Sequence, residues 1–413
     1  MKEHGVSNDK RAPWPPSSRQ SIPQRPGEGP GPETLASVIA PHGNGNRPEA
    51  GFVLHVLPSA IGRGAQLYAR ALVDLLDEPD QPHRLMSIYE GDQGIHVDLS
   101  LGRPGGAAAA GGFDPRVALR LRRYCAERSP GVLVAHGGDP LKYLVAARPR
   151  VPIAYNAIGT VERSVHSRLR RELWRRLLAR ADVVAAVSED VAEECRSLLN
   201  VPAGKVVVVP NGRDSEMFSP RPTSSGGSLA GAGDSDLPML LFVGHLAPGK
   251  RPDVFVELVR ALRAQGVSCK AAVVGDGPMR GALTEPARSA GVELLGERND
   301  VAELMRGADL FVFPSLPEGE GMPGVLIEAG LSGLCVLATR VPGVSTVIDD
   351  RITGSVVDVS DFGSLVQEAR RLLADPVVRS EMGRAAREKC VSDFSMQASA
   401  RAWRDLLGRL SRR

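Results

Sequence analysis

From residue 311 the chain reads Phe311-Val-Phe-Pro-Ser-Leu-Pro-Glu-Gly-Glu320-Gly-Met-Pro-Gly-Val-Leu-Ile-Glu328-Ala329. Its first three residues predict a buried strand, and the apolar residues after the loop predict a helix that starts near Pro323. Proline suits the first helical position because its missing N–H would have no intrahelical partner there. Two carboxylates, Glu320 and Glu328, therefore stand on either side of a junction between loop and helix.

The first turn of such a helix exposes backbone N–H groups, which bind anions such as phosphate. Glu328 lies about 7.5 Å further along the helix axis than Pro323, at about 1.5 Å per residue. Loop glutamate, helix N-terminus and helix glutamate thus line up in the order that a nucleotide-sugar needs for its sugar, phosphates and ribose. In the alternative interpretation, Glu320 is a solvated loop residue and Glu328 is an ordinary residue of the helix surface.

This stretch resembles the Glu-x7-Glu motif of the retaining glycosyltransferases of family 4, which have the GT-B fold. The resemblance implies that Glu320 contacts hydroxyls of the transferred sugar and that Glu328 contacts those of the nucleotide ribose. It extends over residues 51 to about 410 and implies an α/β fold, in which two Rossmann-like domains with parallel sheets face a central cleft. It also implies that the residues between the glutamates bind the donor: Gly321, Met322, Pro323 and Gly324.

Composition limits the possible classes of protein. The 413 residues suffice for two domains with full cores, and 42% hydrophobic with 24% charged residues is typical of a soluble globular protein. A net charge of +3 is too small to indicate a nucleic-acid partner. The five cysteines have no metal-ligand spacing and indicate free thiols in a reducing compartment. No apolar run approaches the ~18 residues that span a bilayer, so we expect a cytoplasmic protein.

Strand patterns alternate with helical patterns twice along the chain, which indicates two parallel sheets with helices on both faces. The expected strands are 52–57, 84–89, 132–135, 153–155, 183–187 and 206–209, and then 239–243, 270–274, 293–295, 310–313, 334–338 and 355–357. The predicted organisation is a disordered Pro-rich tail (1–49), an acceptor-side domain (50–218), a Gly/Ser/Pro linker (219–236), a domain that binds the nucleotide-sugar (237–395) and a helix that returns to the first domain (396–413).

A second motif follows the strand 239–243, where Gly244-His245 precedes Lys250-Arg251. It resembles the family's Val-Gly-Arg-Leu…Lys-Gly segment, in which an arginine and a lysine hold the diphosphate. The resemblance implies that Lys250 stabilises the charge of the leaving group. His245 departs from the pattern, because a neutral imidazole offers one donor where a guanidinium offers a charged fork. Arg251 or a protonated His245 could replace the missing charge, and in the alternative Lys250 is a solvated residue at a helix start.

In the first domain, Gly62 and Gly64 follow the first expected strand and resemble the Gly-Gly loop that meets the donor diphosphate or the acceptor; the alternative is a tight turn. His136 ends the strand 132–135, at the sheet edge where parallel sheets bind ligands. Its resemblance to the family's strand-end histidine implies a role near the reacting sugar, and a structural histidine is the alternative.

Arg298 lies in a segment that in the family approaches the base.

The segment Pro210-Asn-Gly-Arg213-Asp resembles the family's Pro-Asn-Gly-Val-Asp, which closes the first domain. Asn-Gly is a turn signal, so we expect a structural role for this segment.

The residues Arg163 to Arg180 contain seven arginines interleaved with apolar residues. Such a basic amphipathic helix can lie on the anionic inner face of a membrane, or its apolar stripe packs on the domain and the arginines are solvated.

The resemblance implies a retaining glycosyltransferase that moves a sugar from a nucleotide-sugar to an acceptor hydroxyl. The acceptor is a small molecule, a glycan or a lipid-linked molecule. We expect no metal and no cofactor, because Lys250 and helix N-termini would stabilise the leaving group. Two alternatives stay open: a sugar-nucleotide epimerase or phosphorylase on the same fold, and a catalytically weak protein that binds nucleotide-sugar, for which the departure at His245 argues.

Overall fold

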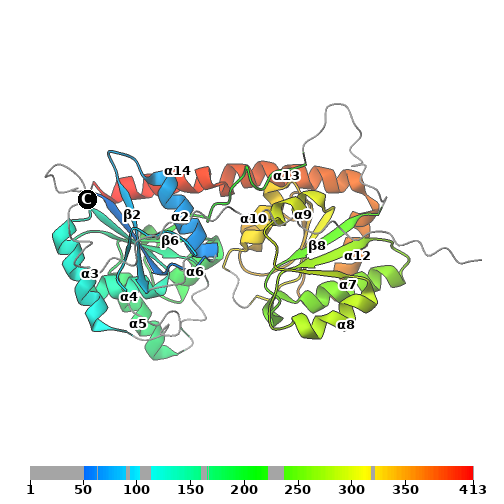
Figure 1. The fold of residues 1–413 in the computed structure, drawn as a ribbon, viewed down its shortest axis with the longest axis horizontal. Helices are drawn as coiled ribbons and strands as arrows, with labels where there is room; N and C mark the ends of the chain where they lie inside the picture. The colour runs from blue at the N-terminus through cyan, green and yellow to red at the C-terminus, as the bar shows by residue number, and fades with distance from the viewer. Residues whose placement is uncertain are drawn as a thin grey trace, which may run out of the picture. The chain divides into compact units, whose positions relative to one another are not determined.

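The computed structural model of the protein describes residues 51–62, 64–89, 94–102, 113–159, 165, 167–221, 237–317 and 321–412. The expected tail 1–49 and most of the expected linker, residues 222–236, lie outside the described residues. All described residues belong to one compact unit. Within it the chain forms two parallel sheets in sequence, each covered by helices (Figure 1).

The first sheet has the strand order β3-β2-β1-β4-β5-β6-β7, and every neighbouring pair is parallel. The strand order reverses at β1 and β4, as in doubly wound sheets. The strands are β1 (Val53–Ser59), β2 (His83–Tyr89), β3 (Leu99–Ser100), β4 (Val132–His136), β5 (Ile153–Ala157), β6 (Val183–Ala186) and β7 (Val206–Val208). The helices are α2 (Gly64–Leu76), α3 (Pro115–Arg128), α4 (Gly138–Ala147), α5 (Arg168–Ala179), α6 (Glu189–Ser197) and η3 (Ala203–Lys205).

The second sheet has the order β10-β9-β8-β11-β12-β13, again all parallel. Its strands are β8 (Met239–Val243), β9 (Lys270–Val274), β10 (Glu293–Gly296), β11 (Leu310–Phe313), β12 (Val336–Thr339) and β13 (Ser355–Val357). The helices are η4 (Pro248–Lys250), α7 (Pro252–Ala264), α8 (Arg280–Ala290), α9 (Val301–Gly307), α10 (Gly324–Leu331), α11 (Val344–Val347), α12 (Phe362–Ala374), α13 (Pro376–Phe394) and α14 (Met396–Leu410). Two Rossmann-like α/β domains confirm the predicted fold class.

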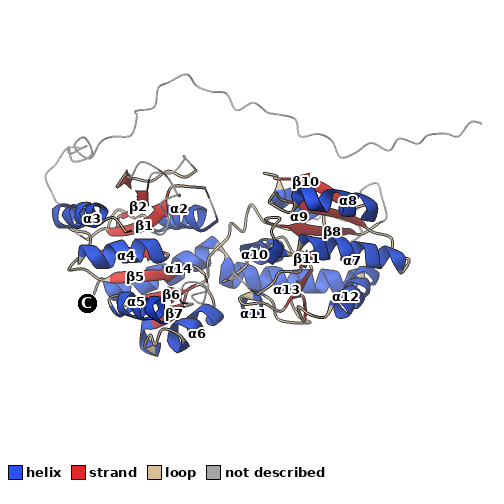
Figure 2. Ribbon diagram, turned by 90° about the horizontal axis from the view of Figure 1, so that it is seen from below, coloured by secondary structure: helices blue, strands red, loops and turns tan. Residues whose placement is uncertain are grey.

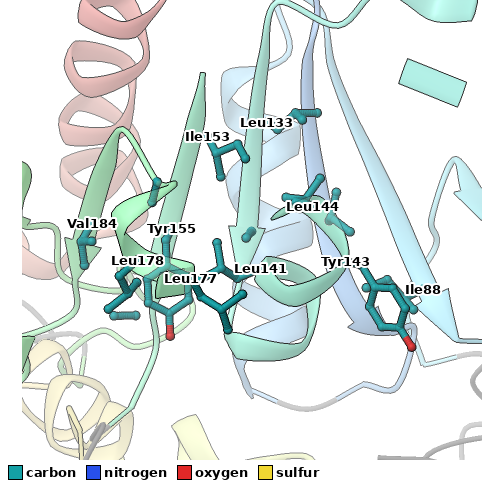
Figure 3. Close-up of a cluster of buried hydrophobic side chains, with 14 of the residues drawn as sticks. Ile88, Leu133, Leu141, Tyr143, Leu144, Ile153, Tyr155, Leu177, Leu178 and Val184 are labelled. Carbon is teal, nitrogen blue, oxygen red and sulfur yellow. The ribbon is translucent and has the colours of Figure 1, made fainter. Parts of the chain in front are cut away.

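Each sheet is buried on both faces, which explains why its strands are almost continuously apolar. In the first domain, one core lies between the sheet and the helices α3 to α6. Figure 3 shows part of it, where side chains of β4 and β5 meet those of α4 and α5. In the second domain, α7, α8 and α12 cover one face and α9, α10 and α13 the other (Figures 1 and 2).

The terminal helix α14 begins at Met396, as predicted for the segment 396–413, and ends at Leu410; it packs on the first sheet beside α2. Trp403 is fully buried there, and its Nε1 donates to the hydroxyl of Tyr68 at 2.9 Å. The Tyr68 hydroxyl is 2.7 Å from Oγ of Ser399, which itself donates to the carbonyl of Pro210 at 2.8 Å. The predicted return of the chain to the first domain is therefore confirmed.

Most of the expected strands lie within two residues of the observed ones, and three details differ. The two-residue strand β3 is absent from the expectation, because so short an edge strand has no pattern to read. The strand expected at 334–338 begins at Val336, since Leu334 and Cys335 still belong to the turn after α10. Pro323 is the residue before α10 and not its first helical residue.

Candidate functional site

The helix α10 follows the loop after β11, and its N-terminus has no side-chain cap. In its first turn the N–H of Leu326 donates to the carbonyl of Pro323, whereas the N–H groups of Gly324 and Val325 have no acceptor among the described residues. The preceding residues 318–320, which include Glu320, lie outside the described residues. A contact between Glu320 and the transferred sugar accordingly stays a prediction.

Glu328 lies in α10, and its side chain is only 20% exposed. Its Oε1 accepts a hydrogen bond of 2.8 Å from Nε of Arg213, and among the described residues no group donates to Oε2. Burial raises the pKa of the Glu328 carboxyl above its ordinary value, and the guanidinium of Arg213 acts in the opposite direction. Glu328 is thus a half-buried residue with an arginine partner, and its contact with the ribose hydroxyls stays a prediction.

The guanidinium of Arg213 lies against the first residues of two helices. A Cβ added to Gly324, the first residue of α10, would overlap Nη2 of Arg213. A Cβ added to Gly64, the first residue of α2, would lie 4.0 Å from the same nitrogen. The predicted donor-binding residues Gly64, Gly324 and Glu328 thus lie around one arginine, Arg213, for which the sequence predicts only a structural role in a turn.

The loop before α10 is held by the N-terminus of α6. Oγ of Ser188 donates to the carbonyl of Gly321 at 2.9 Å, and Oδ2 of Asp190 accepts from the N–H of Gly343 at 2.6 Å. Gly343 has φ +78°, and an added Cβ would press on the carbonyl of Gly321 and on Met322. Met322 packs against cores of both domains. Gly321 and Met322 are therefore fixed in place from two sides.

The end of β8 packs against the Gly-rich turn after β9. Gly244 donates its N–H to the carbonyl of Val274, and the N–H of Leu246 donates to the carbonyl of Asp276. Gly275 has φ +129°, and a Cβ there would collide with the carbonyl of Gly244. This contact requires glycine at position 275. It leaves His245 exposed at the carboxyl edge of the second sheet.

Lys250 stands close to the end of β11. Its Nζ lies 5.6 Å from the ring centre of Phe313, and the carbonyl of the preceding Gly249 accepts from the N–H of Leu316 at 2.8 Å. Both contacts connect η4 with the β11–α10 loop that continues to residue 320. The structure therefore places the predicted phosphate-binding Lys250 beside the end of β11 and the described start of the loop that follows it.

Two other predicted donor-binding arginines have protein partners. Nη1 of Arg251 donates to the carbonyl of Val359 at 3.0 Å, and the side chain lines a cavity of about 490 Å³ beside α7 and α8. Nε of Arg298 donates to Asp300 at 2.7 Å, and this hydrogen bond raises the pKa of the arginine. Contacts of either arginine with the donor stay predictions.

The Gly-rich turn after β1 is partly described. A Cβ added to Gly62 would lie 3.2 Å from Cα of Gly94, whose N–H donates to the carbonyl of Ala60. This close approach gives Gly62 a structural reason to be glycine. Arg63, between the two glycines, lies outside the described residues.

His136 is buried at the end of β4 and belongs to a row of hydrogen-bonded side chains. Its Nε2 is 3.0 Å from Nδ1 of His55, whose Nε2 is 2.9 Å from Nδ1 of His83. Its Nδ1 is 3.1 Å from Nδ2 of Asn156. Burial lowers the pKa of His136 to about 3 and that of His83 to about 4. We call His55, His83 and His136 the histidine row. Both ring nitrogens of His136 thus have protein partners, and its role near the sugar stays a prediction.

The basic segment forms α5, and only its second half packs on the domain. Leu177 and Leu178 are buried, whereas Leu169 is 86% and Leu173 52% exposed. The alternative in which the apolar stripe packs on the domain therefore holds for Val165, Trp174, Leu177 and Leu178, but not for Leu169 and Leu173. In the described part of the chain, no helix is long and apolar enough to cross a membrane. No group of three or more His, Cys, Asp or Glu side chains there could hold a metal ion.

Three residues that touch the predicted site were not assigned to it from the sequence. Ser188 is the N-cap of α6, and Asp190 lies in its first turn. A serine before a helical stretch predicts an N-cap, but it does not indicate what else these two side chains bind. Arg213 could have been noticed in the sequence, because it stands where the family's motif has valine. A charged residue at a position that is apolar in the motif suggests that its side chain has a partner in another part of the chain.

Two parallel α/β domains, a helix that returns to the first domain and an uncapped α10 with a half-buried glutamate define a chain of the GT-B class. Family models agree. The description "Glycosyl transferase 4-like domain" matches residues 49–212, and "Glycosyl transferases group 1" matches residues 237–375, which together are more than half of the chain. The chain belongs to glycosyltransferase family 4.

Curated relatives support this assignment. D-inositol 3-phosphate glycosyltransferase of Nocardiopsis dassonvillei is 33% identical over 275 residues, which cover 62% of this chain and 62% of that protein. The match therefore spans less than two thirds of that relative's length. GDP-mannose-dependent alpha-(1-6)-phosphatidylinositol monomannoside mannosyltransferase of Mycolicibacterium smegmatis is 27% identical over 308 residues, or 71% of this chain and 80% of that protein.

Solved structures show the same fold. Anabaena Alr3699/HepE in complex with UDP and glucose superposes with a TM-score of 0.70 at 17% identity, covering 87% of this chain and 100% of that chain. Sucrose-phosphate synthase from Thermosynechococcus elongatus gives a TM-score of 0.67 at 18% identity, covering 87% and 99%. The predicted GT-B fold is confirmed.

Proposed function

We propose that the protein transfers a sugar from a nucleotide-sugar to an acceptor hydroxyl and retains the anomeric configuration. The observation that carries this proposal is Glu328. Its carboxylate is half-buried in α10, a few residues after an uncapped N-terminus, and Oε2 accepts from no described group. A ribose hydroxyl can donate to that oxygen while the N–H groups of the first turn bind a phosphate.

The chemistry follows from charge. When the bond between sugar and phosphate breaks, negative charge grows on the departing nucleoside diphosphate, and a fixed cation stabilises it. Lys250 and the N-terminus of α10 supply positive charge without a metal ion. No general base is required, because an oxygen of the departing phosphate can accept the proton of the acceptor hydroxyl on the same face of the sugar. Retention of configuration results.

The names of the relatives support a nucleotide-sugar donor. One relative is named for GDP-mannose and another for UDP-Gal, and the Anabaena structure holds UDP. The acceptors in these names differ, and they include inositol phosphate and lipid-linked molecules. The acceptor of this chain accordingly belongs to the class of small molecules, glycans or lipid-linked sugars with a free hydroxyl.

A thermal-shift panel of UDP-, GDP-, ADP- and TDP-sugars tests the donor. A ligand at about 100 times its Kd stabilises the native state by about 2.7 kcal/mol. We expect one base to raise the Tm well above the others. With that donor, an acceptor panel should release nucleoside diphosphate and form a new glycoside of the same anomeric configuration, seen by NMR, with equal rates in excess EDTA.

Other outcomes separate the alternatives. Binding without turnover for any acceptor would favour the weak nucleotide-sugar-binding protein. Conversion of the donor into an isomeric nucleotide-sugar would indicate an epimerase, and a requirement for inorganic phosphate would indicate a phosphorylase. An inverted product or a loss of activity in EDTA would contradict the proposed mechanism.

We also infer that α5 contacts an anionic membrane surface. Its exposed Leu169 and Leu173 are one turn apart and are flanked by exposed arginines: Arg168, Arg170, Arg176 and Arg180. Leucines can enter the interface between headgroups and acyl chains while each arginine near the surface contributes about 1 kcal/mol. Such a contact would bring the enzyme to a lipid-linked acceptor.

Sedimentation with vesicles tests this contact. Wild type should bind vesicles of phosphatidylglycerol and phosphatidylcholine but not pure phosphatidylcholine, and L169S/L173S should lose most of the binding. Ile352→Ser is the matched control, because Ile352 is 63% exposed in the second domain. Equal binding of wild type and L169S/L173S would refute the assignment to α5.

A further inference from the structure

The side chain of Arg213 has two edges with different surroundings. Nε donates to Oε1 of Glu328 at 2.8 Å, and Nη1 donates to the carbonyl of Gly212 at 3.1 Å. Nη2 donates to no acceptor among the described residues, although it lies against Gly324. The arginine side chain is 21% exposed. Nη2 belongs to both edges of the guanidinium, because it shares one with Nε and the other with Nη1. Each edge therefore has one nitrogen bonded to the protein, and Nη2 is left for a ligand.

The location of this cation is unfavourable without an anion nearby. The N-terminus of a helix carries a positive partial charge, and a guanidinium there is repelled by the helix dipole. Arg213 lies against Gly324, the first residue of α10. Gly64, the first residue of α2, is also close, since a Cβ there would lie 4.0 Å from Nη2. The carboxylate of Glu328 offsets one positive charge. Among the described residues, no second anion lies against Nη2 or the N-terminus of α10.

We propose that Arg213 binds the diphosphate of the donor through Nη2 while its Nε orients Glu328 for the ribose. This proposal rests on the proposed function, because it assigns a residue to the same donor site. An ionised diphosphate oxygen accepting from a guanidinium forms a charge-assisted hydrogen bond, and the planar fork can serve a carboxylate and a phosphate together. Arg213 thus determines how the enzyme distinguishes a nucleoside diphosphate from a nucleoside.

Two features of the chain agree with this role. The guanidinium lies where a Cβ at position 324 would be, so a larger residue there would move Nη2 away from the helix N-terminus. His245, at the end of β8, provides a ring with one donor when neutral, where the resembling motif has arginine. Arg213 therefore gives the site a permanent cation in addition to Lys250.

The experiment compares two ligands in each variant. Isothermal titration calorimetry measures the Kd of UDP, GDP, ADP or TDP, whichever base wild type prefers, and the Kd of the matching nucleoside. Arg213→Val removes both edges of the guanidinium. A disturbed Glu328 weakens both ligands alike, so the ratio of nucleoside Kd to nucleoside diphosphate Kd isolates the diphosphate contact.

We expect this ratio to fall at least about tenfold in Arg213→Val, the change that corresponds to a charge-assisted hydrogen bond of about 1.4 kcal/mol. Glu328→Gln is the matched control: both ligands should weaken and the ratio should stay within about twofold of wild type. Because Arg213→Val leaves Glu328 without its partner, Arg213→Gln is the second variant. Its amide can still donate to Glu328 but carries no charge, and the ratio should fall similarly.

A ratio unchanged in both arginine variants would overturn the proposal and make Arg213 a structural partner of Glu328 only. Tighter binding of the diphosphate by either variant would also overturn it, since Arg213 would then block the site. If wild type binds none of the four diphosphates, the proposed function fails instead. Wild-type binding with an unchanged ratio refutes the inference alone.

Discussion

Acidification below about pH 6.5 should destabilise the first domain, because of the histidine row. With Nδ2 of Asn156 as donor, His136 donates from Nε2 to His55, and His55 donates from Nε2 to His83. Each ring then carries one proton and is neutral. Burial lowers the pKa of His136 to about 3 and of His83 to about 4, and burial and the neighbouring rings lower the pKa of His55 well below 6.5.

The sign follows from the unfolded chain, in which histidine has a pKa of about 6.5. Above this pH neither state binds the proton, and the stability is complete. As the pH falls from about 6.5 towards the folded pKa, the unfolded state gains a proton that the folded state refuses, and the free energy of unfolding decreases. The loss is about 1.4 kcal/mol per pH unit for each histidine.

At about pH 5, His83 and His136 should each have lowered the free energy of unfolding by about 2 kcal/mol, or about 4 kcal/mol together. His55 acts in the same direction. This is a large part of the ~5–15 kcal/mol that stabilises a folded domain. Burial alone would raise the pKa of Glu368, but hydrogen bonds from Arg371, Ser355 and Arg351 lower it to about 2, so this carboxylate stays ionised above pH 5. The difference between wild type and a variant of the row isolates the contribution of the histidines.

Urea unfolding followed by tryptophan fluorescence at several pH values between about 7.5 and 5 measures this loss. Trp403 reports on the site, because its buried ring lies 6.3 Å from that of His136. His83→Gln should reduce the slope by about 1.4 kcal/mol per pH unit, whatever its effect at neutral pH. His96→Gln is the control, because His96 is exposed and lies outside the row. A change of less than about 1 kcal/mol between pH 6.5 and 5 in wild type would refute the reasoning.

Three further predictions concern the donor site. Glu328→Ala should weaken nucleotide-sugar and free nucleoside diphosphate alike by about 1.5–3 kcal/mol, and equal calorimetric affinity in mutant and wild type would remove Glu328 from the site. Glu320→Gln should lower kcat with the nucleotide-sugar and leave the Kd of the sugarless nucleotide nearly unchanged; a comparable loss of both would reverse our assignment of the two glutamates. His245→Arg should keep or raise kcat by restoring a permanent charge, and a large decrease would assign His245 a specific role.

The sheets could be predicted from the sequence because parallel strands buried on both faces read as continuous apolar runs. The start of α14 could be predicted because its apolar stripe packs on one surface. The edge strand β3 could not, since two residues carry no periodicity. In α5 the apolar spacing is clear but misleading. It includes Leu169 and Leu173, which are exposed, because the spacing does not show how far the neighbouring core extends.

Some parts of the candidate site could also be predicted from the sequence and others could not. Glu328 and Gly324 could be placed close together because one helix fixes their separation. The partner of Glu328 could not be predicted, because Arg213 is 115 residues away in sequence and reaches it through a turn whose pattern announces only a turn. The histidine row was equally hidden. His55 and His83 stand among apolar strand residues, and only the parallel register of β2, β1 and β4 brings them and His136 onto one sheet face.

The terminal helix has a consequence for the donor site beyond its packing. Gly212 approaches the chain so closely that an added Cβ would lie 2.7 Å from Cα of Met396, where α13 ends and α14 begins. At this junction the N–H of Arg213 donates to the carbonyl of Phe394, and the carbonyl of Arg213 accepts from the N–H of Met396. Both backbone groups of Arg213 are thus held by the segment that turns the chain back to the first domain. Because the backbone is fixed there, the guanidinium can reach Glu328 and Gly324 in one defined position. The return of α14 therefore positions the cation that we assign to the diphosphate.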